Sequence, residues 1–387
     1  MIVTLKDITT KITKGTTPTS IGCKFEKSGI NFIKSESLVD GKTIDKSKFA
    51  FISERTHERL KRSQIEENDI LFSMAGMFLG KTGIATAEVV PANTNQAVAI
   101  IRVDDTKANY EYVYYYLNQK SVIHTINTTS AQSAQPNINL KQIGEIKINL
   151  PDRKKQDQIV SLLSAIDLKI SNDVEINDNL SDLLQTIYQG QFGKVGLANN
   201  CGILADICSY SKDKIEISKL SLDTYYSTEN MLPEKSGAVK ATSLPTTSQT
   251  TACHKGDTLI SNIRPYFKKI VYCEDDCGCS TDVLCFKPVH PRYTAYLFST
   301  LYADSFFDFM VAGAKGTKMP RGDKQQIMTY PVVLPSEKDL SEFNSVATPI
   351  LTQIYSNRTE SERLSAIRDT LLPKLILGEI DVSSIQL

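Results

Sequence analysis

The sequence contains an internal duplication, and this feature constrains the fold more than any other. Residues 146–151 (IKINLP) and 330–335 (YPVVLP) are two apolar segments separated by an offset of 184 in the numbering, each preceded by a polar segment with a proline. Further upstream, residues 68–73 (NDILFS) match residues 256–261 (GDTLIS) with an offset of 188, which indicates a small insertion. The chain is therefore expected to contain the same fold twice.

A long amphipathic segment follows each copy. Apolar residues recur there with a 4-3-4 spacing that is typical of a coiled-coil seam. Residues 156–189 predict a helix roughly 50 Å long at a rise of about 1.5 Å per residue, ending near Gly190 and Gly193. Two helices buried in ordinary bundle cores are the alternative. The polar outer faces and narrow apolar stripes favour an antiparallel pair that holds two globular blocks apart, with Asn177 helping to set its register. The predicted seam comprises Ile159, Leu163, Ile166, Ile170, Leu180, Leu184, Ile187, Phe343, Ala347, Ile350, Ile354, Leu364 and Leu371.

The globular blocks contain short β-rich segments among Gly, Pro, Asn and Ser, and residues 112–117 and 295–309 predict aromatic-rich helices. The expected fold class is α+β: two duplicated blocks with curved, mostly antiparallel sheets, joined by two long antiparallel coiled-coil helices. The predicted boundaries are 1–151 for the first block, 152–190 for the central helix, 191–335 for the second block, 336–378 for the C-terminal helix and 379–387 for a tail.

A length of 387 residues exceeds one ordinary domain and indicates two or three units. A composition of 41% hydrophobic and 23% charged side chains is typical of a soluble globular protein. The first residues enter a strand-like pattern without a basic-then-apolar signal, and apolar runs are too short to span a membrane. Eight irregularly spaced cysteines are typical of reduced thiols. The predicted location is the cytoplasm.

The formal net charge is zero, but the charges are unevenly distributed. Residues 1–150 carry 19 Lys and Arg against 15 Asp and Glu, and residues 191–335 carry 16 against 14. The two helical segments are acidic, with 4 against 7 in residues 151–190 and 5 against 8 in residues 336–387. This alternation is compatible with a nucleic-acid partner for the two mildly basic blocks.

Residues 75–82 (AGMFLGKT) fit a relaxed phosphate-loop pattern. Such a loop needs a helix directly after it, so that backbone N–H groups surround the phosphates. Residues 83–86 instead predict a turn into a strand, and a glycine loop whose Lys81 contacts a DNA phosphate is the better interpretation.

Two other patterns imitate enzyme sites. Asp152 and Asp167 with Lys169 resemble a metal-dependent nuclease motif, but we expect Asp167 on the exposed face of a long helix, roughly 20 Å from its start. The cysteines at 273, 277, 279 and 285 lack the paired spacing of a zinc site and are expected to be buried strand thiols. The sequence therefore predicts no catalytic residue, no metal and no cofactor in this chain.

Several segments resemble the specificity subunits of type I restriction–modification systems. Residues 371–380 (LLPKLILGEI) are similar to the characteristic ending of that family, and residues 133–138 (SAQPNI) to the loop before the last strand of its target-recognition domains. Residues 149–159 resemble the entry to its conserved helix, whereas residues 336–340 (SEKDL) lack the glutamine at the second entry. Residues 227–231 and 256–265 are also similar, so the resemblance spans the whole chain.

This resemblance implies a non-catalytic subunit that recognises a two-part double-stranded DNA site. Each block would be a target-recognition domain, and the helix pair would set the spacing and bind two modification (methyltransferase) subunits, which motor-nuclease subunits then join. S-adenosylmethionine and ATP would be bound only by those partners. The alternatives are a free-standing nuclease or ATP-using enzyme, and a coiled-coil scaffold without sequence-specific DNA binding.

Basic and polar side chains on glycine-rich loops are the candidate DNA contacts, because loops can reach base edges while phosphate contacts set the register. Each could instead be an ordinary solvated surface residue or, for Arg264 and Tyr266, have a structural role in the sheet. The predicted contacts are Lys34, Ser35, Lys81 and Gln135, with Lys14 a weaker choice, in the first block, and Arg264, Tyr266, Lys268, Lys269, Lys315, Lys318 and Arg321 in the second.

Overall fold

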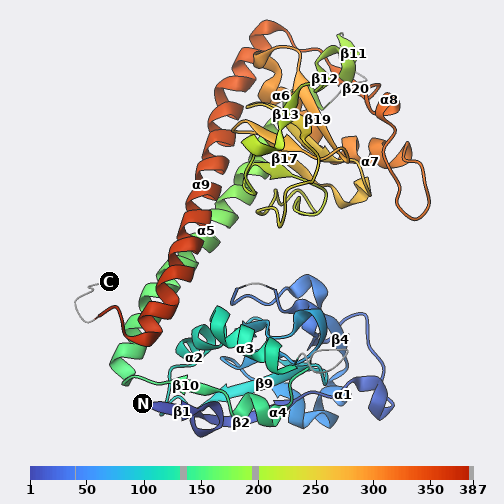
Figure 1. The fold of residues 1–387 in the computed structure, drawn as a ribbon. Coiled ribbons are helices and arrows are strands. Elements are labelled where there is room, and N and C mark those ends of the chain that lie inside the picture. Colours follow the sequence, from blue (N-terminus) through green and yellow to red (C-terminus); the bar gives the residue numbers. More distant parts are fainter. Residues whose placement is uncertain (40, 131–136, 194–199, 383–387) are drawn as a thin grey trace. The chain divides into compact units, whose positions relative to one another are not determined.

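The computed structural model describes residues 1–39, 41–130, 137–193 and 200–382, and the chain divides into two compact units (Figure 1). Unit 1 comprises Met1–Lys169 with Arg363–Leu387, and unit 2 comprises Ile170–Glu362. Two long helices, α5 (Arg153–Phe192) and α9 (Glu337–Leu377), contribute one part to each unit.

Unit 1 contains three small sheets. β1 (Ile2–Thr4) pairs antiparallel with β10 (Lys147–Asn149). The central sheet is antiparallel and has the order β2-β9-β6-β7, with strands Thr9–Lys14, Val98–Val103, Ile70–Ser73 and Thr82–Ile84. The third sheet, β4-β3-β8-β5, has one parallel pair, β3–β8, and comprises Ala50–Ile52, Ile30–Ile33, Ala92–Thr94 and Gln64–Ile65.

The helices of unit 1 are α1 (Glu54–Arg59), α2 (Tyr110–Leu117), α3 (Lys120–Ser130) and α4 (Leu140–Gly144). Helix α2 begins after Asn109, whose side chain accepts hydrogen bonds from the first-turn N–H groups. Tyr112 on α2 is fully buried in one core with Phe72 of the central sheet, Ile159 of α5 and Leu375 of α9. The core thus fixes both long helices to this unit.

Unit 2 repeats this topology. β11 (Cys201–Ile203) pairs with β20 (Pro331–Val333), and the central sheet β12-β19-β16-β17 comprises Cys208–Tyr210, Val283–Pro288, Thr258–Ser261 and Ile270–Tyr272. The third sheet, β13-β15-β18-β14, also has one parallel pair, β14–β18, and comprises Lys214–Glu216, Gln249–Cys253, Cys277–Cys279 and Tyr225–Tyr226. The α+β class with mostly antiparallel sheets, predicted from the sequence, is confirmed.

The helices of unit 2 are α6 (Thr294–Tyr302), α7 (Asp304–Ala312) and α8 (Lys324–Ile327). The sequence predicts a single helix over residues 295–309, but the segment forms two helices, α6 and α7. Ala303 has an extended backbone (ψ 141°), which ends α6 and starts α7. This break lets Leu301 and Phe306 on the two helices enter the same core.

The duplication extends to individual hydrogen bonds. The hydroxyl of Tyr112 donates to the Asn149 carbonyl at 2.6 Å, and the hydroxyl of Tyr296 donates to the Val333 carbonyl at 2.6 Å. The two donors and the two acceptors are each related by the offset of 184 seen in the sequence, and the same offset relates the first residues of α5 and α9. The first residues of strands β6 and β16 are related by the other offset, 188.

Helix α5 does not end at Gly190, as the sequence predicts, but continues to Phe192. Phe192 is buried, with ring centroids 4.9 Å from Tyr296 and 5.5 Å from Phe343. Burying this aromatic ring outweighs the small helical cost of a glycine, roughly 1 kcal/mol relative to alanine. Gly193 follows the last helical residue, and its N–H donates to the Gln189 carbonyl.

Within unit 2, α5 and α9 are joined by a polar contact. Asn357 Nδ2 donates to Asn177 Oδ1 at 2.9 Å, and Asn177 Nδ2 donates to the Ile354 carbonyl at 3.2 Å. Five of the predicted seam residues have fully buried or nearly buried side chains: Ile159, Leu163, Leu184, Phe343 and Ala347. Ile350 is also buried, and the rest are half-buried: Ile166, Ile170, Leu180, Ile187, Ile354, Leu364 and Leu371.

Candidate nucleic-acid interface

In each unit a hairpin loop meets the loop that precedes a short helix. In unit 1 the β6–β7 hairpin loop (residues 74–81) contacts the start of the segment before α4, since the Ile138 N–H donates to the Met74 carbonyl at 2.9 Å. In unit 2 the β16–β17 hairpin loop (residues 262–269) contacts the α7–α8 loop (residues 313–323), since the Arg264 N–H donates to the Pro320 carbonyl at 2.8 Å. The same pair of loops therefore meets in both copies.

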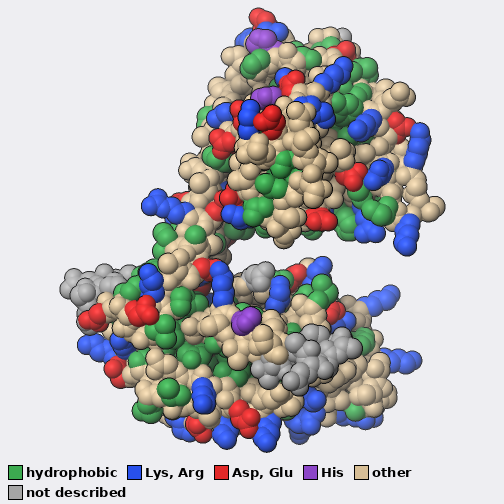
Figure 2. Space-filling model, viewed as in Figure 1, with side chains coloured by type: hydrophobic (Ala, Val, Ile, Leu, Met, Phe, Trp, Pro, Cys, Tyr) green, Lys and Arg blue, Asp and Glu red, His purple; other side chains and the backbone are tan. Residues whose placement is uncertain are grey.

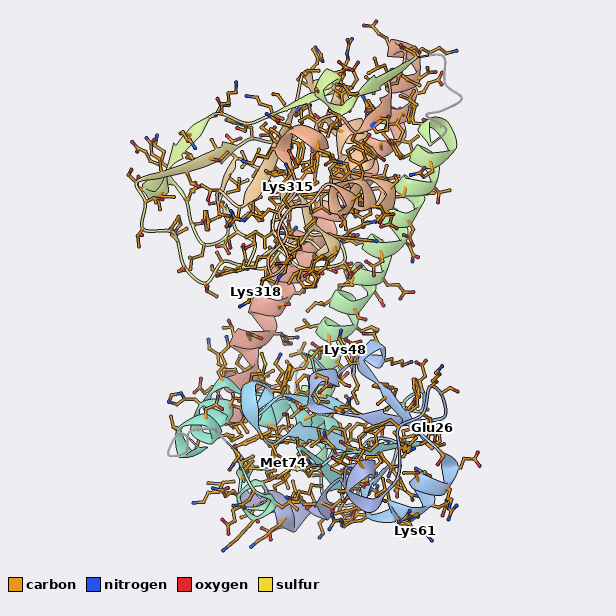
Figure 3. The ribbon with its side chains drawn as sticks, turned by 90° about the vertical axis from the view of Figure 1, so that its right-hand side faces the viewer. Glu26, Lys48, Lys61, Met74, Lys315 and Lys318 are labelled. Carbon is orange, nitrogen blue, oxygen red and sulfur yellow. The ribbon has the colours of Figure 1, made fainter. Side chains whose placement is uncertain are left out.

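The two loops of unit 2 concentrate positive charge. Residues 262–269 and 313–323 contain six Lys and Arg and one acidic residue, Asp323. In Figure 2, basic side chains project from the part of unit 2 where Figure 1 draws the α7–α8 loop, and Figure 3 labels Lys315 and Lys318 on it. Such an excess of cations on the two loops suits a phosphate backbone. The structure brings together seven predicted contacts here: Arg264, Tyr266, Lys268, Lys269, Lys315, Lys318 and Arg321.

The hairpin loop of unit 2 has an unusual backbone. Arg264 (φ 51°) and Lys268 (φ 50°) lie in the left-handed region on either side of a 3-10 turn, Pro265–Phe267. Each such residue costs on the order of 1 kcal/mol or more and persists only when its surroundings hold it in place. Here the N–H groups of Glu234 and Lys235 donate to the carbonyls of Phe267 and Lys268 at 2.8 and 2.9 Å.

Acidic residues orient several of the cations: Asp304 and Asp282 lie outside the two loops, and Asp323 ends the α7–α8 loop. Asp304, at the start of α7, accepts from both Lys235 and Lys268 at 2.8 Å, and these hydrogen bonds lower the pKa of Asp304 to about 2. Lys315 pairs with Asp323 and Arg321 with Asp282.

Two other lysines differ from these. Lys269 donates to the Thr228 carbonyl at 2.6 Å, and burial lowers its pKa. Lys318 is exposed and forms no ion pair within the described part of the chain. Lys318 is therefore the cation most available to an outside phosphate.

The corresponding loop of unit 1 carries a single cation, Lys81, which is half-buried where the loop joins β7. The strand β7 comes directly after this loop and pairs antiparallel with β6. Residues 75–82 thus lead into a strand and not into the helix that a phosphate loop requires. The turn into a strand that the sequence predicts at residues 83–86 comes earlier, because the strand already begins at Thr82 and ends at Ile84.

The other predicted contacts of unit 1 lie elsewhere. Lys34 and Ser35 follow β3 of the third sheet, where Lys34 pairs with Glu36 and lies 5.5 Å from the Phe25 ring centroid. Lys14 is exposed at the end of β2. Gln135 lies outside the described residues. The structure thus does not place Lys34 and Ser35 on the hairpin loop with Lys81.

Sequence reasoning missed the apolar side chains of these loops. Met77, at the apex of the unit 1 hairpin, is 88% exposed, and Phe267 and Met319 in unit 2 are 36% and 50% exposed. Their position inside glycine- and proline-containing turns was the only signal in the sequence. It was overlooked because hydrophobic residues are normally assigned to cores.

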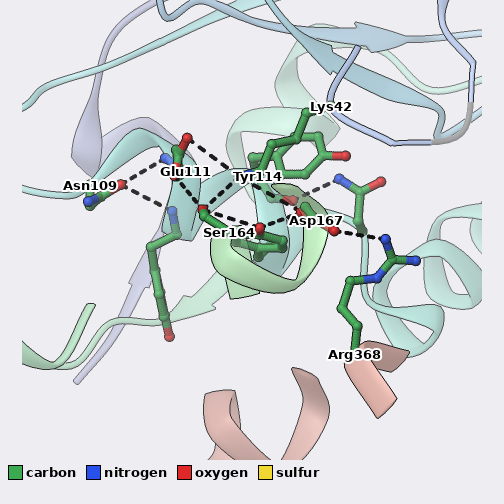
Figure 4. Close-up of polar contacts among 10 residues, drawn as sticks. Lys42, Asn109, Glu111, Tyr114, Ser164, Asp167 and Arg368 are labelled. Carbon is green, nitrogen blue, oxygen red and sulfur yellow. Dashed lines mark hydrogen bonds and ion pairs between the residues drawn. The ribbon is translucent and has the colours of Figure 1, made fainter. Parts of the chain in front are cut away.

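Asp167 is not on an exposed helix face, and this expectation was wrong. Its carboxylate accepts from the Tyr115 hydroxyl at 2.5 Å and from Arg368 of α9 at 2.9 Å, with Lys42 at 3.9 Å (Figure 4). Ser164 and Glu111 complete the network: Lys42 donates to Ser164 at 2.9 Å, and Ser164 donates to Glu111 at 3.0 Å. Asp167 lies on α5 and its partner Arg368 lies on α9, whereas Tyr115 and Lys42 belong to the globular part of unit 1. The network around Asp167 therefore attaches both long helices to this unit.

All eight cysteines are free thiols. Cys273, Cys277, Cys279 and Cys285 are buried around β18 and β19 in one apolar cluster. Among the residues that the structure describes, no three His, Cys, Asp or Glu side chains are arranged to hold a metal ion. Likewise, no helix of the described residues is both long and apolar enough to cross a membrane.

These features define a duplicated binding protein: two α+β units, each with the same pair of adjacent loops, on a shared pair of long helices. Residues 1–181 match the family model described as type I restriction modification DNA specificity domain. The specificity subunit of the type I restriction enzyme MjaIX from Methanocaldococcus jannaschii is 21% identical over 322 residues, 76% of this chain and 74% of that protein. The EcoBI specificity subunit from Escherichia coli is 23% identical over 192 residues, 46% of this chain and 39% of that protein.

Among solved structures, the S subunit of a type I restriction-modification system from M. genitalium has the same fold, with a TM-score of 0.56 at 17% identity over 97% of this chain and 95% of that chain. The matched family model covers residues 1–181, which include the N-terminal part of unit 1, and the internal duplication relates the fold of unit 2 to that of unit 1. The first part of the chain is thus similar to the type I restriction modification DNA specificity domain, and the whole chain is similar in fold to a type I S subunit.

Proposed function

We propose that this chain is the sequence-specific DNA-binding subunit of a type I restriction–modification complex, and that each unit recognises one half of a bipartite double-stranded site. The observation that carries this proposal is the paired-loop arrangement present in both units, which in unit 2 gathers six cations and a single acidic residue, Asp323. Phosphate contacts from such loops would orient each unit, and neighbouring side chains would then recognise base edges.

Within this proposal the chain performs no chemistry itself. It binds two modification (methyltransferase) subunits along the long helices, and motor-nuclease subunits join that core. S-adenosylmethionine and ATP are bound by those partners. The duplicated fold supports this stoichiometry, because two equivalent units offer two equivalent docking surfaces. A scaffold without DNA preference would have no need of loops with such an excess of cations.

The test is to purify the chain with the methyltransferase encoded beside it and to map methylated bases in the host genome. We expect two partner copies per chain and a split methylated motif that disappears when this chain is deleted. A methylation pattern that is unchanged by the deletion would refute the proposal and favour the scaffold.

A further inference from the structure

The apices of the two hairpin loops lie at adjacent positions of the duplicated fold, because the offset of 188 relates Met77 to Pro265 and Phe78 to Tyr266. Met77 is the central residue of the 3-10 turn Gly76–Phe78, and Tyr266 is the central residue of the turn Pro265–Phe267. The flanking strands correspond with an offset of 188 on both sides, β6 with β16 and β7 with β17. Met77 is 88% exposed and Tyr266 47%. Single exposed apolar residues are common, but here the central residue of the corresponding turn is apolar and exposed in both units.

Both apices are held in a defined conformation. In unit 1, Gly76 (φ 72°) and Gly80 (φ 84°) adopt a left-handed backbone conformation. The loop is closed by two hydrogen bonds, from the Ser73 N–H to the Lys81 carbonyl and from the Gly80 N–H to the Ser73 carbonyl. In unit 2, non-glycine residues adopt that backbone and are fixed by hydrogen bonds to residues 234 and 235 and to Pro320. A fixed apex loses little freedom on binding, which suits a recognition element.

The surroundings of Tyr266 indicate the chemistry of its ligand. The Phe267 ring lies 4.7 Å from that of Tyr266, and the half-exposed Met319 lies on the adjoining α7–α8 loop. Lys269 Nζ lies 6.0 Å from the Phe267 ring centroid, and the same two loops carry the other cations. On DNA, the phosphates would match the cations, and the apolar group that a base presents in the major groove is the C5-methyl of thymine.

We propose that Met77 and Tyr266 each contact the C5-methyl group of a thymine, one in each half of the target. This inference rests on the proposed function and specifies which base feature the hairpin apices recognise. It also predicts a division of labour: the lysines and arginines supply affinity for any sequence, and the two apices supply discrimination.

The experiment uses the complex with its methyltransferase and fluorescent duplexes carrying the mapped motif. Each thymine of the motif is replaced in turn by deoxyuridine, which removes only the methyl group. We expect one sensitive position in each half, with binding weakened about fourfold, as for loss of one buried methyl. Tyr266→Ala should remove the sensitivity in one half only, and Met77→Ala in the other half only.

Val289→Ala is the matched control, because Val289 is an exposed apolar residue of unit 2 outside the two loops. It should leave both sensitivities intact, and thermal melting should show that all three variants are folded. Uniform binding of every deoxyuridine duplex, or sensitivities that persist in both apex variants, would overturn the proposal. If the unmodified complex binds its motif no better than an unrelated duplex, the proposed function itself fails.

Discussion

Asn177 and Asn357 face each other across the two long helices of unit 2, joined by a hydrogen bond of 2.9 Å between side-chain amides. Asn357 is buried, and its Oδ1 also accepts from Gln353 at 2.7 Å. A polar pair inside an apolar interface fixes the register of helices, because any slip would leave its donors and acceptors without partners.

A double-mutant cycle tests this role. Asn177→Leu alone should lower the free energy of unfolding by about 1–3 kcal/mol, since it leaves the Asn357 amide buried without its partner. Asn177→Leu with Asn357→Leu should recover most of that loss, because two apolar groups can pack together. Urea unfolding measures each step, and additive single losses would contradict the pairing.

The attachment of the helices to unit 1 depends on Asp167. Arg368→Ala should destabilise unit 1 by about 1–3 kcal/mol, because the half-buried carboxylate of Asp167 would lose its guanidinium partner. Arg363→Ala, an exposed arginine one turn earlier on α9, is the matched control and should have an effect within about 0.5 kcal/mol. Equal melting temperatures for the two variants would argue against the network.

The ion pairs of Asp304 predict a pH dependence. Its folded pKa, about 2, lies below the ordinary value of 3.8, so its stabilising contribution is present above pH 3.8 and is lost as the pH falls through about 2. Wild type should exceed Asp304→Asn in stability at pH 5 by at most about 1 kcal/mol, because the carboxylate is largely exposed. The difference should vanish near pH 2, as urea unfolding of both proteins can show.

Salt dependence tests the role of Lys318. If this lysine neutralises one phosphate, Lys318→Ala should reduce the slope of log affinity against log salt by about 0.9 and weaken binding to all duplexes alike. Lys338→Ala changes an exposed lysine at the start of α9 that pairs with Glu342, and it should leave the slope unchanged. An unaltered slope for both variants would remove Lys318 from the interface.

Gly15 tests the independence of the two units. A Cβ at this position would lie 1.7 Å from the Thr94 carbonyl oxygen, so Gly15→Ala must displace the backbone at the end of β2. Calorimetry should show a transition of unit 1 at a lower temperature, with the transition of unit 2 retained. Gly190→Ala, where a Cβ meets open space inside α5, should be neutral or slightly stabilising.

The duplication, the two long helices and the central strands could be predicted because each depends on local periodicity. Residues 70–72 and 259–260 are short apolar runs, and they lie in buried inner strands of the central sheets. The third sheets were harder to foresee, because strands such as Ala92–Thr94 are short and polar and acquire their conformation from non-local pairing.

The candidate site was predictable in part. The cations of the unit 2 loops were evident from sequence, since glycine and proline mark the loops that carry them. The environment of Asp167 was not, because helical periodicity alone cannot show that Lys42, Tyr115 and Arg368 come from distant segments to the same carboxylate. Likewise, the exposure of Met77 depends on a turn geometry that its neighbours determine together.

Each globular block begins and ends on two adjacent antiparallel strands, β1 with β10 and β11 with β20, and a long helix follows directly. The entry and exit of a block are therefore neighbours in space. A crossover in the gene at each end of a block would exchange that block as a cassette and leave the helices intact. A population carrying such chains could thus change its DNA target in a single recombination event, without altering the partner subunits.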